Sequence, residues 1–273
     1  MPETEVGPKG KLRFVDVETA RAARGVRLAL LAGLPSPWSD GARALFATKG
    51  IDVLAVRYLP GDTTVTAWTG VPNAPAVMVD DEPARSGWAE IVALAERLRP
   101  ALPLVPASAG ARARMFGLLH ELLDENGVAW SRRLLIVDES FRPEDPARPR
   151  CGFPLPIAQR LAARYGYTPE RVPAAKARLI EALAHLDAEL RAGSGDGAGH
   201  GPYFFGATLT ALDLYAAAVT AVLAPPEEAL RPIIPVLRPI FDHLDPEVAA
   251  AVTPALRAHR DLMYARHMHD PSA

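Results

Sequence analysis

The hydrophobic pattern in the first part of the chain alternates between strand-like and helix-like segments. Residues 26–32 form a largely apolar run, which is typical of a strand with both faces buried in a sheet. A helical pattern follows, with Ser39 or Asp40 as its predicted N-cap and Gly50 as its predicted end. Residues 51–58 give a second strand-like run. This order predicts two parallel strands joined by a right-handed crossover.

A third strand and an amphipathic helix continue the pattern. Pro75 precedes the short apolar run 76–79, which predicts a strand. Residues 87–98 carry apolar side chains at the spacing of one helix face. Residues 1–24 come before the first of these strands. The pattern leaves open whether they cover a site or extend the sheet.

Prolines indicate where the chain divides. Three of them lie within 99–107 and would interrupt any helix, so this segment is the predicted linker. Beyond it, apolar residues recur at helical spacing in two long stripes, Met115, Leu118, Leu119, Leu122 and Leu123, and then Leu179, Leu183, Leu186 and Leu190. The sequence predicts an α/β domain at 1–98 and an all-helical domain at 108–273, with loops at 138–156 and 193–202.

Composition and charge narrow the classes of function. The chain has 30 Lys and Arg residues against 32 Asp and Glu residues, and its net charge of −2 gives no broad positive field for a nucleic acid. A single cysteine, Cys151, excludes an intramolecular disulfide and suits a reducing compartment. The charged N-terminal segment lacks the apolar core of a signal peptide, and Asp213 interrupts the apolar run 209–224. We therefore expect a cytoplasmic protein that binds neither nucleic acid nor a membrane.

Four short motifs, in order along the chain, point to a known family. They are Ser36-Pro37-Trp38-Ser39, Ala74-Pro75-Ala76-Val77-Met78-Val79-Asp80, Arg85-Ser86, and the set Gly206, Thr210 and Asp213. Thr210 and Asp213 have the spacing of a capping box, which predicts the start of a buried helix. In order and spacing the motifs resemble the cytosolic glutathione transferase superfamily, with a serine-type N-terminal motif like that of bacterial members. The resemblance implies a thioredoxin-like N-terminal domain followed by an all-helical C-terminal domain.

The resemblance also implies roles for individual residues. Ser36 corresponds to the hydroxyl that activates the glutathione sulfur, and a donor beside a helix N-terminus favours a thiolate. Ala74 and Pro75 correspond to a cis peptide whose backbone binds the cysteinyl part of glutathione, although the sequence fits either isomer. Ser86 corresponds to the serine that binds the γ-glutamyl carboxylate. For Ser36 and Ser86 the alternative is a helix N-cap alone, and Ser39 is interpreted as a cap.

Arg85 departs from the family pattern, which usually has Glu or Gln at this position to help hold the γ-glutamyl end. A guanidinium repels an ammonium group, so Arg85 is expected to weaken glutathione binding or to reorient that end. The alternative is that Arg85 points to the solvent.

Other candidate sites are interpreted as structural. His120 and Asp124 have the spacing of an exposed pair on one helix. His267 and His269 lack further ligands at a known spacing, so we expect a solvated tail and no metal. Cys151 is not part of a Cys-x-x-Cys pair, which disfavours redox chemistry of the thioredoxin type.

The leading hypothesis is a glutathione transferase-like enzyme in which Ser36 stabilises the thiolate of glutathione, the co-substrate, for attack on a small apolar electrophile. Addition, displacement and thiol-dependent isomerisation all fit. The resemblance also implies a homodimer. The alternative is a binding or scaffold protein with this fold, little or no glutathione affinity and no catalysis.

Overall fold

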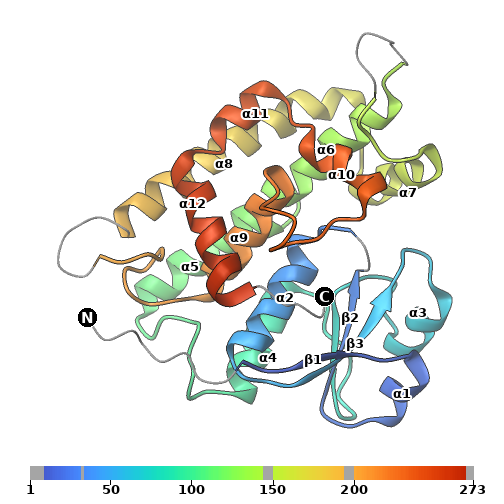
Figure 1. Ribbon diagram of the computed structural model, residues 1–273, viewed down its shortest axis with the longest axis vertical. Helices are drawn as coiled ribbons and strands as arrows, with labels where there is room; N and C mark the ends of the chain where they lie inside the picture. Colours follow the sequence, from blue (N-terminus) through green and yellow to red (C-terminus); the bar gives the residue numbers. More distant parts are fainter. Residues whose placement is uncertain (1–8, 32–33, 144–149, 194–199, 269–273) are drawn as a thin grey trace.

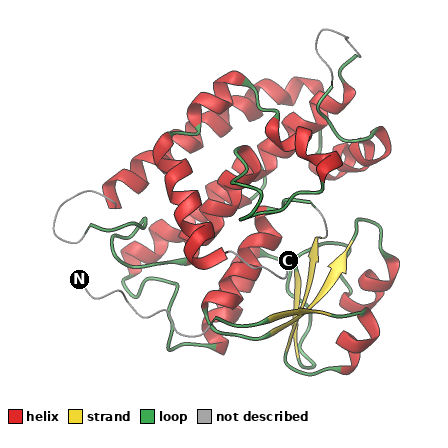
Figure 2. Cartoon of the chain, viewed as in Figure 1, coloured by secondary structure: helices red, strands yellow, loops and turns green. Residues whose placement is uncertain are grey.

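The computed structural model describes residues 9–31, 34–143, 150–193 and 200–268. It contains a four-stranded sheet with its own helices, next to a larger part made of helices (Figures 1 and 2). This is the expected order of an α/β part followed by a helical part. None of the helices in these ranges is long and apolar enough to cross a membrane.

The sheet has the strand order β1-β3-β2-β4. β3 lies between β1 and β2 and is parallel to both, whereas β4 runs antiparallel to β2. The strands are β1 (Leu12–Phe14), β2 (Val26–Leu31), β3 (Val53–Tyr58) and β4 (Ala76–Val79). The helices of this part are α1 (Val17–Ala22), α2 (Pro37–Thr48), α3 (Thr63–Thr69) and α4 (Trp88–Leu98). The three strands predicted from hydrophobic runs are confirmed.

The start of α2 differs from the prediction. Its N-cap is Ser36, whose Oγ accepts a hydrogen bond from the Ser39 N–H at 3.4 Å, so the assignment of the cap to Ser39 or Asp40 was wrong. The physical reason is Pro37, which has the φ angle of a first helical residue and no N–H to satisfy. Ser39 lies inside the helix instead, where its Oγ accepts from the Leu31 N–H at 3.2 Å. This bond ties the end of β2 to the first turn of α2.

The segment that precedes β2 extends the sheet, within its described residues. β1 pairs with β3 in parallel register, with Leu12 opposite Val53. α1 packs against α3 and β3, and its buried Ala20 joins an apolar cluster with Val56 and Val65. Of the two alternatives for residues 1–24, extension of the sheet is therefore correct for residues 9–24.

The C-terminal part is built around one buried helix. Every residue of α9 (Ala211–Leu223) is buried, and α9 contacts α2, α5, α6 and α12 (Figure 1). The surrounding elements are α5 (Ala109–Leu123), α6 (Val128–Phe141), α7 (Leu155–Tyr165), α8 (Val172–Gly193), α10 (Arg238–Asp242), α11 (Pro246–Ala251), α12 (Pro254–Met263), the 3-10 turns Pro169–Arg171 and Pro235–Leu237, and the π-helical turn Tyr264–Met268. The predicted loop 138–156 is shorter, because α6 reaches Phe141 and α7 begins at Leu155. Much of that loop and of the glycine-rich segment 193–202 lies outside the described residues.

The predicted capping role of Asp213 is confirmed. Its carboxylate is fully buried and accepts from the Thr210 N–H at 2.8 Å, the Thr210 hydroxyl at 2.8 Å and the Phe204 N–H at 3.0 Å. His259 Nε2 lies 3.1 Å from the same carboxylate. Because four groups converge on one buried carboxylate, Asp213 joins the start of α9 to the preceding segment and to α12.

Close contacts fix α2 against the helical part. A Cβ at Gly41 would lie 2.1 Å from the Tyr215 ring, so α2 and α9 approach at a distance that only glycine permits. Trp38 Nε1 donates to the Leu123 carbonyl at 2.9 Å. At the other end of α2, the fully buried Lys49 binds Glu96 of α4 at 2.7 Å. The contacts of Gly41 and Trp38 with the helical part position the first turn of α2, which carries Ser36. The segment 99–107 lies between α4 and α5, and its role as a domain boundary stays a prediction.

Candidate functional site

Strand register brings one end of β2 and the start of β4 together. Ala29 pairs with Ala76, and continuing this antiparallel register places Ala74 opposite Leu31, the last residue of β2. Ser36 follows Leu31 by five residues along the chain. Ala74 and Ser36 therefore belong to the same end of the sheet.

A bridge between Val77 and Arg85 adds the next segment to this end of the sheet. The Val77 N–H donates to the Arg85 carbonyl at 2.8 Å, and the Arg85 N–H donates back at 2.9 Å. In this antiparallel register, Ser86 lies beside Ala76. The predicted site residues thus come from three segments that meet around the ends of β2 and β4.

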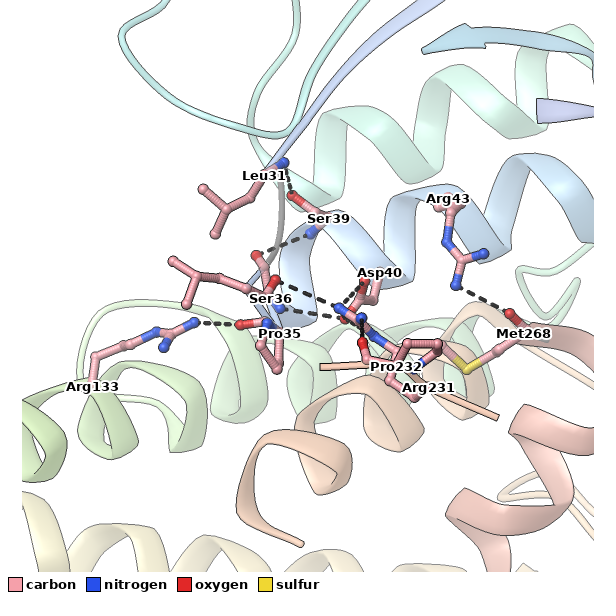
Figure 3. Close-up of polar contacts among 11 residues, drawn as sticks. Leu31, Pro35, Ser36, Ser39, Asp40, Arg43, Arg133, Arg231, Pro232 and Met268 are labelled. Carbon is pink, nitrogen blue, oxygen red and sulfur yellow. Dashed lines mark hydrogen bonds and ion pairs between the residues drawn. The ribbon is translucent and has the colours of Figure 1, made fainter. Parts of the chain in front are cut away.

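Ser36 is almost completely buried, with 3% of its surface exposed. Its Oγ accepts from the Ser39 N–H, and its own N–H donates to Asp40 Oδ2 at 3.3 Å (Figure 3). Within the described residues, the Ser36 hydroxyl hydrogen has no acceptor. The alternative that Ser36 is a helix cap is correct as a description of its structure, and the cap leaves one hydroxyl proton for a further acceptor.

Buried guanidinium groups surround the turn that carries Ser36. Arg133, on α6, donates from Nη2 to the Pro35 carbonyl at 2.6 Å, and Arg231, on the segment after α9, binds Asp40 at 3.1 Å (Figure 3). Burial lowers the pKa of the Arg133 guanidinium. Burial and repulsion from Arg133 lower the pKa of the neighbouring Arg132 to about 9. Asp40 pairs with Arg231, whereas Arg133 donates to the Pro35 carbonyl, so the two guanidinium groups give the turn a positive field.

This arrangement favours an anion next to Ser36. The first N–H groups of α2 and its helix dipole add to the field of the buried guanidinium groups. A thiolate or a carboxylate at this place would gain the charge-assisted hydrogen bonds that such donors form.

The structure assigns the isomer of the Ala74–Pro75 bond, which is cis. The Ala74 N–H donates to the side-chain oxygen of Asn73 at 2.8 Å. A ligand that pairs with the Ala74 backbone would exchange this hydrogen bond for its own.

Ser86 is half-buried, and its hydroxyl has no hydrogen bond within the described part of the chain. The N-cap of α4 is Gly87, so the interpretation of Ser86 as that cap was wrong. The next residue takes the cap position because Glu90 bonds back to the Gly87 N–H at 3.2 Å.

Arg85 does not point to the solvent, contrary to that alternative. Its Nη2 binds Glu82 at 2.7 Å, and its Nη1 is buried without a partner among the described residues. Glu82 also binds Arg97 at 2.7 Å, and hydrogen bonds from Arg97 and Arg85 lower the pKa of the Glu82 carboxyl. The charge of Arg85 is thus partly balanced by Glu82.

A cavity of about 380 Å³ adjoins the first turn of α2. Leu31, Ser39 and Asp40 line one side of it, and the segment 228–235 lines the other. Sequence reasoning missed this segment and Arg231, because nothing in the spacing of a proline-rich stretch links it to α2. Arg133 had a detectable signal, since two adjacent arginines precede the apolar run 134–137.

The expectation of a solvated C-terminal tail is wrong for His267, and His269 lies outside the described residues. His267 is 3% exposed, and burial lowers the pKa of its imidazole to about 4. The described ranges contain no group of three or more His, Cys, Asp or Glu residues arranged for a metal ion. His120 and Asp124 form the expected exposed pair.

Comparison with protein-family models and with curated proteins gives no match. Among solved structures, the chain is similar to a glutathione S-transferase from Methylobacterium radiotolerans in complex with glutathione sulfonate, with 18% identity, 88% of this chain and 91% of that chain covered, and a TM-score of 0.59. It is also similar to a glutathione S-transferase from Xanthobacter autotrophicus, with 19% identity and a TM-score of 0.54. That match covers 90% of this chain and 96% of that chain.

A third similar structure is a glutathione S-transferase from Methylobacillus flagellatus with glutathione bound, with 14% identity, 86% and 98% covered, and a TM-score of 0.53. These similarities extend over both parts of the chain. The chain therefore has the fold of the glutathione transferases.

Proposed function

We propose that this protein is a glutathione-dependent transferase in which the Ser36 hydroxyl stabilises the thiolate of glutathione. The observation that carries the proposal is the hydroxyl of Ser36, which keeps a proton to donate while it caps α2 among buried guanidinium groups. A donor in such a field lowers the pKa of a bound thiol, and the resulting thiolate is a strong nucleophile.

The other predicted residues would hold the rest of glutathione. The Ala74 backbone, next to the cis bond to Pro75, pairs with the cysteinyl part. The Ser86 hydroxyl, which has no internal partner, donates to the γ-glutamyl carboxylate. The residues present fit this ligand. The Ser86 hydroxyl needs to give up no hydrogen bond, and the Ala74 N–H needs to exchange only its bond to the Asn73 side chain for one to the ligand. Two of the similar structures contain glutathione or its sulfonate, which supports the proposal.

In the reaction, the thiol proton leaves to the solvent and the Ser36 hydroxyl donates to the sulfur anion. The sulfur then forms a bond to a small apolar electrophile, whose leaving group departs in a displacement. We also propose a cytoplasmic homodimer as the working form, as the resemblance to the family implies.

Affinity for glutathione should be low because of Arg85. Its guanidinium, held by Glu82, lies next to the segment that would bind the γ-glutamyl end and its ammonium group. We expect a dissociation constant in the millimolar range or above, which corresponds to about −4 kcal/mol or less favourable.

A non-catalytic binding protein is the second candidate. It is favoured by the burial of Ser36, at 3% exposed, and by the hydrogen bond that already occupies the Ala74 N–H. In that case glutathione would not bind, or would bind without formation of a thiolate.

Substitution of Ser36 tests the proposal. Ser36→Ala should lower the rate of glutathione conjugation to chlorodinitrobenzene by about 10- to 1,000-fold, because one charge-assisted hydrogen bond to the sulfur is lost. Ser108→Ala is the matched control, since Ser108 caps α5 in the same way, accepting from the Ala111 N–H at 3.2 Å. Equal rates in the two variants would remove Ser36 from the mechanism. No conjugation and no glutathione binding in the parent would support the second candidate.

A further inference from the structure

A second and larger cavity, of about 830 Å³, lies at the opposite end of the sheet from Ser36. Its lining includes Gly25 and Val26 at the start of β2, whereas Ser36 follows the end of that strand. The starts of β1 and β3, the later turns of α2 and the turn Tyr264–Met268 complete it. The proposed transferase chemistry makes no use of this cavity.

Cationic side chains dominate the charge of this cavity. They are Lys9, Lys11, Arg13, Arg24 and Arg43. Among the described residues that line it, Asp52 is the sole acid, and its carboxylate accepts from the Lys11 backbone N–H at 2.8 Å. Arg24 is paired with Asp80 and Asp81. Lys11 and Arg13 remain as the cations that the cavity offers to an anion.

Lys11 and Arg13 have no ion pair within the described part of the chain, and both residues are exposed at the cavity. Their backbone is held in place. The Gly10 N–H donates to the Ala47 carbonyl at 2.9 Å, and a Cβ at Gly10 would lie 2.2 Å from the Ile51 carbonyl oxygen. The two cations are thus presented by a fixed segment.

A buried polar group adds an independent observation. His267 lines the cavity and is 3% exposed. Its Nε2 lies 3.1 Å from the Tyr203 hydroxyl, while its Nδ1 is buried without a partner among the described residues. When the Tyr203 hydroxyl donates to Nε2, the hydrogen of the neutral ring is on Nδ1, which then becomes an unused donor. A buried donor without a partner is costly, and a ligand acceptor would remove that cost.

The rest of the lining is apolar and includes Val26, Ala44 and Val53. A volume of about 830 Å³ far exceeds that of an inorganic ion and lies in the range of organic ligand sites. A phosphate group brings a charge near −2 and three acceptor oxygens, which suits several separate cations better than one carboxylate does.

We propose that this cavity binds a phosphate ester with an apolar organic group. The phosphate contacts Lys11, Arg13 and the buried donor of His267, and the organic group lies against the apolar wall. This site is separate from the glutathione site, so its occupancy does not depend on Ser36.

Calorimetry with phenyl phosphate tests the proposal. The full chain should bind one equivalent, and Lys11→Ala/Arg13→Ala should weaken that binding by about tenfold or more, because two charge-assisted contacts are lost. Arg99→Ala/Arg164→Ala is the matched control, since it removes two exposed cations elsewhere and should leave the affinity unchanged. Ser36→Ala should also bind as the parent does.

Two further ligands separate the parts of the proposal. Inorganic phosphate should bind more weakly than phenyl phosphate, since it lacks the apolar group, and phenylacetate should bind more weakly because it has a single charge. Equal affinity for either of them would overturn the assignment of the ligand. Absence of binding at millimolar phenyl phosphate, or equal losses in the two double variants, would overturn the site itself.

Discussion

Removal of the Asp213 carboxylate should be among the most destabilising single changes in the chain. Asp213 is fully buried, and its two oxygens serve two backbone N–H groups, the Thr210 hydroxyl and the His259 ring. In Asp213→Ala these partners lose their acceptor inside a packed core. Each unsatisfied buried group costs about 1–3 kcal/mol, so even partial relaxation leaves a loss of about 3–5 kcal/mol.

Urea denaturation, followed by circular dichroism, measures this loss. The matched control is Asp62→Ala, because Asp62 caps α3 through two backbone N–H groups at a partly exposed place. That variant should lose about 1 kcal/mol, which is typical of an N-cap. Similar losses in the two variants would refute the reasoning from burial and would reduce Asp213 to an ordinary cap.

Three other predictions follow from close contacts and charge. Gly41→Ala should destabilise the fold by about 1–2 kcal/mol in the same assay, since its Cβ would overlap the Tyr215 ring. An unchanged midpoint of urea denaturation would show that α2 and α9 can move apart without loss of stability. His267 has a folded pKa of about 4 against an ordinary 6.5, so the unfolded chain binds more protons and stability should fall, by up to about 3 kcal/mol, as the pH drops from 6.5 to 4. His267→Asn should flatten that dependence, and a slope equal to the parent's would contradict it. Arg85→Glu should tighten glutathione binding in calorimetry, because a carboxylate replaces the repulsive guanidinium; weaker binding would mean that Arg85 helps to hold the ligand.

Much of the fold was predictable because burial leaves a local pattern. The apolar runs of β2 and β4 reflect strands covered on both faces, and the pair Thr210 and Asp213 marked the start of α9. The start of α2 was less predictable, since Ser36, Ser39 and Asp40 are all good caps. The choice depends on Pro37 and on the bond from Leu31 to Ser39, which is a tertiary contact.

The charges at the candidate site come from segments far apart in the sequence. Arg231 lies 191 residues from Asp40, and Arg133 lies 98 residues from Pro35. No spacing rule connects such residues, since their contact depends on how the segment after α9 passes over the first turn of α2. The burial of His267 was missed for the same reason, because it follows from packing of the last turn against Tyr203.

The pKa of the glutathione thiol in the complex tests the central claim most directly. The difference in ultraviolet thiolate absorbance between protein with glutathione and glutathione alone, recorded across a pH series, gives this pKa for the parent, Ser36→Ala and the control Ser108→Ala. We predict a pKa well below the free-thiol value of about 8.5 in the parent and the control, and a return toward it in Ser36→Ala. The same thiol pKa in the parent and in Ser36→Ala would contradict the assignment of thiolate stabilisation to Ser36.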